Sequence, residues 1–254
     1  MEGAPASGLA DIAVEICDRY TGVGGDGWML IDRTPGDGFD ASIRLFNSDG
    51  SEPELSGNGT RCAAALLARE RPDKSEFRIR TGAGVKSLRL VSRGGNEFQF
   101  EMNMGRIRVV ELHAAVRGRD AVLVDAGNPQ CAIPVDDFDF DWRALGAAIE
   151  KDRLFPKRTN VSFLRPTGPH AIEVRFWERG AGETNSSGTG STGAAVAAVA
   201  RELVEPPVTV ITTAGALESR FEPGGNAREG GTVLLTGPAV LVAEGIFHRE
   251  KMKR

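Results

Sequence analysis

Two serine residues in the same motif, 131 positions apart, are the first candidates for chemistry in this sequence. Ser56 opens the segment Ser-Gly-Asn-Gly-Thr, and Ser187 opens Ser-Gly-Thr-Gly-Ser. A serine before a glycine-rich turn is typical of a helix N-terminus, where unpaired N–H groups and the helix dipole form an anion site. Two such sites facing each other would clamp two anionic groups, or hold one carboxylate between opposed residues.

The repeat extends beyond the two serines. The segments 44–47 and 81–84 correspond to 175–178 and 212–215, at the same 131-residue offset and without insertion. Either serine alone is more simply an ordinary helix N-cap. A repeat that keeps its register across three motifs instead favours a functional pair. The sequence therefore predicts two similar halves, with Ser56 and Ser187 opposed across one cleft.

Further polar residues stand at predicted turns or strand ends around these motifs: Asn47, Asn128, Asn160, Glu178 and Arg179. Each asparagine alone is a common turn former, and the last two residues could form a surface pair. An arginine can also take a carboxylate in a bidentate pair. Their agreement with the repeat favours a binding function.

The elements that must position these residues are short strands and a few helices. Alanine-rich helices are predicted over 60–69 and 191–203, each starting at a serine motif, and shorter helices over 12–19 and 142–150. Apolar runs between glycine- or proline-bearing turns predict strands. These runs cover 28–31, 42–46, 77–80, 87–91, 97–100, 121–124, 161–164, 172–176, 208–211 and 233–235.

This pattern predicts an α+β fold of two pseudo-symmetric domains, each a curved, mostly antiparallel sheet around its alanine-rich helix. A helix without a polar face is usually buried, and alanine lets its neighbours approach closely. We expect a seam near 111–113, after a strand and turn that end at Met104–Gly105. The domains are then 1–112 and 113–254, with the last strand crossing back to the first domain.

The composition of the chain argues against several classes of function. The 254 residues carry a net charge of −4, which argues against nucleic acid as the main partner. No apolar run approaches the ~20 residues of a membrane span, and the three scattered cysteines indicate a reduced, cytoplasmic protein. No metal-ligand or phosphate-loop motif is present, so we expect neither a metal nor an organic cofactor. A homodimer is a further expectation.

Several segments together resemble the diaminopimelate epimerase family of cofactor-independent two-base racemases. The similar segments cover nearly the whole chain in the family's order, and the run Glu-Arg-Gly-Ala-Gly-Glu-Thr is the most specific of them. They are 17–27, 46–52, 56–62, 127–129 and 177–184. The resemblance implies two α/β domains with an amino dicarboxylate bound between them.

The resemblance also implies site residues. In the family, two cysteines face each other across the substrate α-carbon, one as thiolate base and one as thiol acid; Ser56 and Ser187 occupy those positions here. Glu178 is the one matched residue with further acid–base potential. The implied reaction interconverts LL- and meso-diaminopimelate in lysine and peptidoglycan precursor synthesis. The implied substrate-binding residues are Asn47, Gly57, Asn58, Asn128, Asn160, Glu178, Arg179, Gly188 and Thr189.

Three departures from the family pattern predict low activity. A serine hydroxyl is far less acidic than a thiol and normally needs an adjacent general base. Gln130 stands where the family has histidine after Gly-Asn-Pro, and an opening strand with Gly-Asn-Asp-Phe is absent. Two alternatives stay open: an isomerase of the same fold that uses Glu178 for a one-base proton shift on a more acidic substrate, and a silent protein that only binds an amino dicarboxylate.

Overall fold

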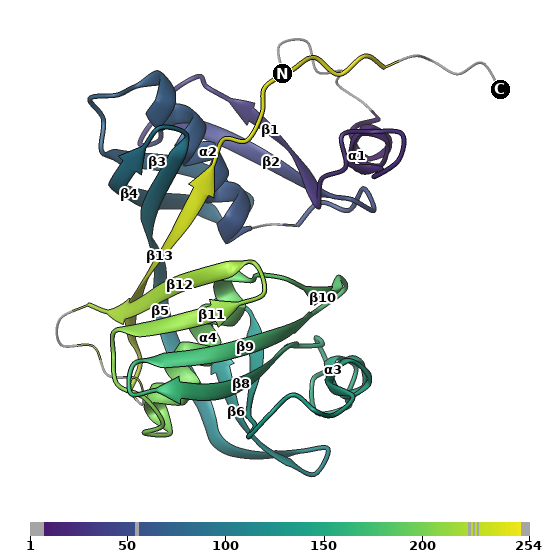
Figure 1. The fold of residues 1–254 in the computed structure, drawn as a ribbon, viewed down its shortest axis with the longest axis vertical. Helices are drawn as coiled ribbons and strands as arrows, with labels where there is room; N and C mark the ends of the chain where they lie inside the picture. The colour runs from purple at the N-terminus through teal and green to yellow at the C-terminus, as the bar shows by residue number, and fades with distance from the viewer. Residues whose placement is uncertain (1–7, 54–55, 223–224, 226, 228, 250–254) are drawn as a thin grey trace. The chain divides into compact units, whose positions relative to one another are not determined.

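The chain forms two compact units in the computed structural model, which describes residues 8–53, 56–222, 225, 227 and 229–249 (Figure 1). Unit 1 comprises residues 1–100 and 238–254, and unit 2 comprises residues 101–237. The chain leaves unit 1 within β5 (Glu97–Val116) and returns within β13 (Gly231–Val240). The predicted absence of an opening strand concerns residues 1–7, which lie outside the described residues.

Unit 1 builds a sheet around one helix. Its strands follow the order β1-β2-β3-β4-β5; β2 and β3 are parallel, and the pairs β1–β2 and β3–β4 are antiparallel. Helix α2 packs against β2, β3 and β4, and α1 packs against β1 and β2. The elements are α1 (Leu9–Cys17), β1 (Gly27–Asp32), β2 (Ala41–Asn47), α2 (Gly57–Glu70), β3 (Glu76–Thr81) and β4 (Gly84–Gly94).

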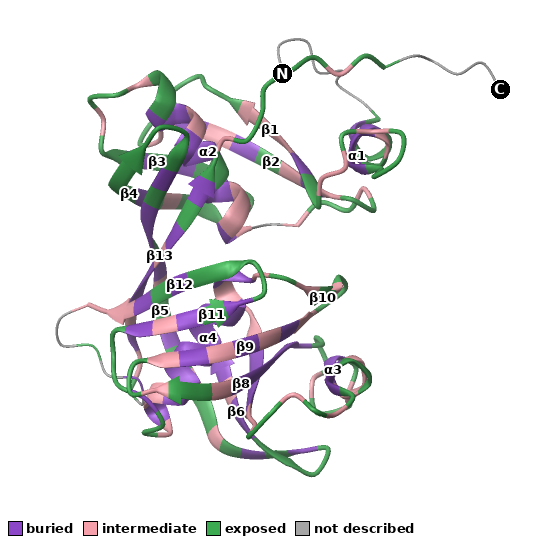
Figure 2. Ribbon diagram, viewed as in Figure 1, coloured by how far each residue is buried: buried purple, intermediate pink, exposed green. Residues whose placement is uncertain are grey.

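Unit 2 is a closed barrel around α4 (Gly188–Ala200). Its strand order is β5-β13-β12-β11-β9-β8-β7-β6, and β6 pairs with β5 to close the ring. Helix α4 has almost no polar face, and Figure 2 shows it buried among the strands. The remaining elements are β6 (Arg119–Asp125), β7 (Pro129–Pro134), α3 (Trp142–Glu150), β8 (Asn160–Gly168), β9 (Ala171–Glu178), β10 (Gly182–Thr184), β11 (Val208–Thr212) and β12 (Gly215–Phe221).

The internal repeat is visible in the local geometry of both units. Ser56 and Ser187 are both extended residues that cap a helix, each accepting a 3.1 Å hydrogen bond from the backbone N–H three residues later. Thr81 and Thr212 both donate to the carbonyl three residues on, at 2.8 and 2.7 Å. Because β2 pairs in parallel with β3 as β9 does with β11, the repeated motifs carry the same supersecondary structure.

The structure confirms the α+β class, the mostly antiparallel sheets and both alanine-rich helices. One strand prediction is wrong. The strand that begins at Glu97 does not end at Met104–Gly105 but continues to Val116. Gly105 takes a φ of 83°, which only glycine adopts at low cost, within the strand instead of in a turn. Its continuation pairs with β6, and this long-range pairing overrides the local turn signal.

Helix α3 closes one side of the unit 2 core. Trp142 and Ile149 from this helix join Phe163 and Ile133 from the strands in one buried apolar cluster. The helix approaches β9 closely where it has no side chain. A Cβ atom added at Gly146 would lie 2.8 Å from the Cβ atom of Trp177.

We therefore expect Gly146→Ala to destabilise the protein by about 1 kcal/mol. Overpacking typically costs about 1–3 kcal/mol, which outweighs the roughly 1 kcal/mol by which alanine improves a helix. Urea unfolding measures the effect. Gly168→Ala in β8 is the control, because no described atom lies within 4 Å of its added Cβ. An unfolding free energy for Gly146→Ala at or above that of the unmodified protein contradicts the prediction.

Candidate active site

Glu178 and Ser187 form a hydrogen-bonded pair in unit 2. Glu178 ends β9, Ser187 precedes the first turn of α4, and the serine hydroxyl donates to the carboxylate. Thr184 donates to the same carboxylate at 2.6 Å. Burial raises the pKa of Glu178 above its usual value of 4.5, although these two hydrogen bonds oppose the shift. A carboxyl in this environment holds its proton to a higher pH than an exposed carboxyl does, which suits a general acid or base.

Arg179 and Asn160 are joined next to this pair. The Arg179 N–H donates to Oδ1 of Asn160 at 2.9 Å, and the asparagine amide donates to the Pro129 carbonyl at 3.3 Å. The contact follows from the pairing of β8 with β9, since Val161 faces Trp177 in that register. The Arg179 guanidinium donates to the Lys157 carbonyl at 3.1 Å. Both the oxygen and the nitrogen of the Asn160 side-chain amide are therefore hydrogen-bonded to backbone groups.

Asn128, which lies between β6 and β7, is hydrogen-bonded to Thr189 on the first turn of α4. The Asn128 amide donates to the Thr189 hydroxyl at 3.4 Å, and Gln130 donates to Oδ1 of Asn128 at 2.6 Å. The Gln130 side chain is buried, and its Oε1 atom has no hydrogen-bond partner among the described residues. Gly193 makes room for it, since a Cβ there would lie 3.0 Å from Cγ of Gln130. Gln130 therefore orients Asn128 toward the helix N-terminus.

Unit 1 holds four of the predicted residues, Asn47, Ser56, Gly57 and Asn58. Ser56 caps α2 and lines a pocket of about 510 Å³ together with Leu45, Thr81 and Gly82. Asn47 ends β2, at the position equivalent to Glu178 in the repeat, and its amide donates to the Ser51 hydroxyl at 2.9 Å.

The first turn of α2 carries Gly57 and Asn58, as α4 carries Gly188 and Thr189. Oδ1 of Asn58 accepts a 2.6 Å hydrogen bond from Arg61, whose side chain is almost fully buried and also donates to the Pro238 carbonyl at 3.2 Å. This buried arginine fixes the helix start from which Ser56 projects.

One residue of the unit 2 site was missed by sequence reasoning: Thr184, which holds the Glu178 carboxylate. It lies within the specific run over 178–184, so the motif signal was present, but the motif does not show which hydroxyl reaches the carboxylate. Across the described ranges, no group of three His, Cys, Asp or Glu side chains is arranged to hold a metal ion. In the same part of the chain, no helix has the length and apolar character needed to cross a bilayer.

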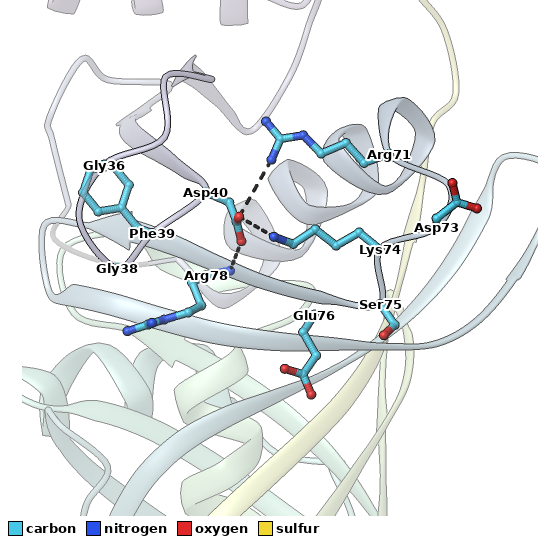
Figure 3. A pocket seen from close by; sticks show the side chains of 10 residues that line it. All are labelled: Gly36, Gly38, Phe39, Asp40, Arg71, Asp73, Lys74, Ser75, Glu76 and Arg78. Atoms are coloured by element: carbon cyan, nitrogen blue, oxygen red, sulfur yellow. Dashed lines mark hydrogen bonds and ion pairs between the residues drawn. The ribbon is translucent and has the colours of Figure 1, made fainter.

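A larger pocket of about 810 Å³ in unit 1 contains none of the predicted site residues (Figure 3). Its centre is Asp40, which accepts hydrogen bonds from the Lys74 ammonium and, at 2.8 Å, from the Arg78 backbone N–H. Arg71 lies 3.8 Å from the same carboxylate. These contacts tie the start of β2 to β3 and to the end of α2. We interpret this cluster as a support of the sheet.

We expect Asp40→Asn to lower the unfolding free energy by about 1–2 kcal/mol at neutral pH. Burial alone would raise the pKa of Asp40, but its hydrogen bonds from Lys74 and Arg78 outweigh burial and lower it below 3.8. A lowered pKa stabilises the fold above the unfolded-state pKa, so this contribution is lost as the pH falls below about 3.8. Urea unfolding at pH 7 and pH 3 tests this, with exposed Asp73→Asn as control; equal stability of the two variants at pH 7 would refute it.

The sequence of this chain is similar to the sequences of known proteins. The family profile described as diaminopimelate epimerase matches residues 3–110 and 122–242. The diaminopimelate epimerase of Desulfitobacterium hafniense is 35% identical, over 97% of this chain and 91% of its own length. That of a Cyanothece species is 37% identical, over 92% of this chain and 89% of its own length.

Solved structures share the fold at low sequence identity. A phenazine biosynthesis protein of the PhzF family from Bacillus anthracis matches with a TM-score of 0.69 and 14% identity, over 94% of this chain and 88% of that one. A probable proline racemase from Agrobacterium radiobacter matches with a TM-score of 0.68 and 15% identity, over 89% and 78%.

The family profile and the relatives define an isomerase-type protein, and the solved structures share its fold. The chain belongs to the diaminopimelate epimerase family, since both the profile and the relatives span most of its length.

Proposed function

We propose that this chain binds diaminopimelate and that Glu178 and Arg179 receive the amino-acid end of the substrate. The observation that carries the proposal is the Glu178–Ser187 pair at the N-terminus of α4, with Arg179 next in the chain. A carboxylate suits an ammonium group, and a helix N-terminus with an adjacent arginine suits a carboxylate. The relatives named diaminopimelate epimerase support this choice of substrate.

The 131-residue repeat supports a second part of the proposal, that Ser56 and Ser187 act on opposite faces of one α-carbon. Inverting that centre requires a base on one face and an acid on the other. Both positions carry hydroxyls in place of the family's thiols, and a neutral hydroxyl cannot readily remove the weakly acidic α-proton. The protein should therefore bind its substrate weakly and epimerise it very slowly.

A second candidate function rests on Glu178 itself. Its raised pKa and its contact with the Ser187 hydroxyl suit a single base that shifts a proton on a more acidic substrate. In that case the reacting carbon is not the α-carbon of diaminopimelate. A protein that binds without turnover is the third alternative.

Calorimetry with meso-diaminopimelate, followed by NMR in deuterated water, distinguishes the three. Binding with slow deuterium entry at the α-position supports the epimerase. Binding without any exchange over days supports a silent binder. Exchange at a different carbon of a more acidic analogue supports the one-base isomerase. No binding at millimolar ligand would contradict the proposal.

Other features of the protein also stay predictions. We expect a cytoplasmic location, a homodimer and no nucleic-acid partner, on the grounds of composition and charge. The domain division at residue 112 also stays a prediction. Size-exclusion chromatography with light scattering measures the oligomeric state directly.

A further inference from the structure

Glu150 is a buried carboxylate outside the predicted site. It is the last residue of α3 and is only 2% exposed. A negative charge at a helix C-terminus opposes the helix dipole, and burying a charge is costly unless it is paired and hydrogen-bonded. Its surroundings must therefore compensate for two unfavourable effects, and they do so with donors drawn from two other segments.

Three groups donate to this carboxylate. The Arg158 guanidinium pairs with Oε1, the Gly180 backbone N–H donates to Oε1 at 2.9 Å, and the Trp177 indole N–H donates to Oε2 at 3.4 Å. Arg158 itself takes a φ of 60°, a conformation unfavourable for a residue with a side chain. The backbone thus bears local strain at the residue that supplies the compensating charge.

Two of these donors flank Glu178 and Arg179. Trp177 precedes them and Gly180 follows them, while Asn160 accepts from the Arg179 N–H at 2.9 Å. The turn closes with the Ala181 N–H donating to the Glu178 carbonyl at 3.2 Å. Consecutive backbone N–H groups at 179 and 180 are therefore fixed by two side chains from outside the turn. Asn160 belongs to the implied family site, whereas Glu150 is assigned by no motif.

We propose that Glu150 is a positioning residue, which sets the Glu178–Arg179 turn for substrate binding through its hydrogen bonds to Trp177 and Gly180. The proposal rests on the proposed function of that turn. Glu150 acts from α3 and does not itself contact substrate. Without the Glu150 carboxylate, the turn would lose the hydrogen bonds that fix its C-terminal side. Arg179 would then no longer be held where the substrate carboxylate binds. Misplacement of this kind by about 1 Å can cost up to about 10²-fold.

The test compares Glu150→Gln and Glu150→Asp with the unmodified chain. Glutamine keeps the length but removes the charge, and aspartate keeps the charge but withdraws it by one methylene. We expect each to weaken meso-diaminopimelate binding about 10-fold in calorimetry, in line with the loss of a charge-assisted hydrogen bond. The Gly180 amide resonance should move upfield in both variants, since its hydrogen bond to a carboxylate is weakened.

Glu173→Gln is the matched control. Glu173 lies on β9, as does Glu178, and pairs with Arg165 and Arg175 at 2.6 Å, away from the turn. Its substitution should lower the melting temperature without changing affinity or the Gly180 resonance. Unchanged affinity within twofold in both Glu150 variants overturns the positioning role. If the unmodified protein binds no diaminopimelate, the proposed function fails. The positioning role is then tested by the Gly180 amide resonance alone, and it is wrong if that resonance does not move in the two Glu150 variants.

Discussion

Replacing both motif serines, in the variant Ser56→Cys/Ser187→Cys, is expected to raise epimerisation of diaminopimelate far above either single substitution. Inversion needs one base and one acid on opposite faces, and general acid–base groups contribute about 10²–10⁴-fold each. The double variant should therefore exceed each single variant by about 10²-fold or more. A single thiol can exchange a proton on one face but cannot complete two-base inversion.

The geometry of the two helix caps indicates which of the two introduced thiols has the lower pKa. At each position a backbone N–H, from Gly59 or Gly190, points at the side chain and would stabilise a thiolate. At position 187 the neighbouring Glu178 carboxylate opposes this effect when it is ionised. We therefore expect the lower thiol pKa at position 56, which thiol titration by ultraviolet absorbance can measure.

Two measurements follow this prediction in parallel: deuterium entry at the α-carbon and the LL-to-meso ratio. Ser75→Cys/Ser219→Cys adds two thiols away from the motifs and should leave both near background. Restoration is expected to stay partial, because Gln130, which donates to Asn128 at 2.6 Å, stands where the family resemblance implies a histidine. Family-like turnover by the unmodified chain would falsify the assignment of the two serines and require a base elsewhere.

Local signals explain what the sequence could predict. The starts of α2 and α4 were predictable because a serine N-cap is a short-range feature, and the same side-chain bond forms at Ser56 and Ser187. The continuation of β5 past Gly105 was not, because it depends on pairing with β6. Strand β10 is only three residues long and forms by pairing with β9, so its own residues carry little strand signal.

The residues of the candidate site were likewise predictable from local motifs, whereas the contacts between them were not. Motifs identified Glu178, Arg179, Asn160 and Ser187, but which of them touch depends on strand register. The contact of Asn160 with Arg179 exists because Val161 faces Trp177 in the β8–β9 ladder, and a shift by one residue would remove it. Register is set by packing across the whole barrel. Glu150 had no sequence signal at all, because an acidic residue at the end of a short helix is ordinarily a surface residue.

Replacing Glu178 by glutamine is expected to weaken diaminopimelate binding by about 10–10²-fold, since a charge-assisted hydrogen bond contributes roughly 1.5–3 kcal/mol. The substrate ammonium loses its anionic partner, while the Thr184 and Ser187 hydroxyls can still donate to the amide oxygen. Glu183→Gln is the control, since that carboxylate pairs with Arg143 at 2.6 Å and is partly exposed. Calorimetry at pH 7.5 measures both variants.

The same Glu178→Gln substitution should make the protein more stable at neutral pH. Burial raises the pKa of Glu178 in the folded state above its usual 4.5. As the pH rises above 4.5, the unfolded chain therefore ionises this carboxyl before the folded chain does, and the unmodified protein loses stability up to the folded-state pKa. Glutamine does not ionise, so the variant escapes this loss. Its advantage in urea unfolding should grow as the pH rises from 4.5 through the folded-state pKa of Glu178, and should vanish below pH 4.5. If the stability of the variant relative to the unmodified chain is lower at pH 7.5 than at pH 4, the ionised carboxylate stabilises the free protein. Glu178 would then support the structure, and the interpretation of Glu178 as a site for a cation would be wrong.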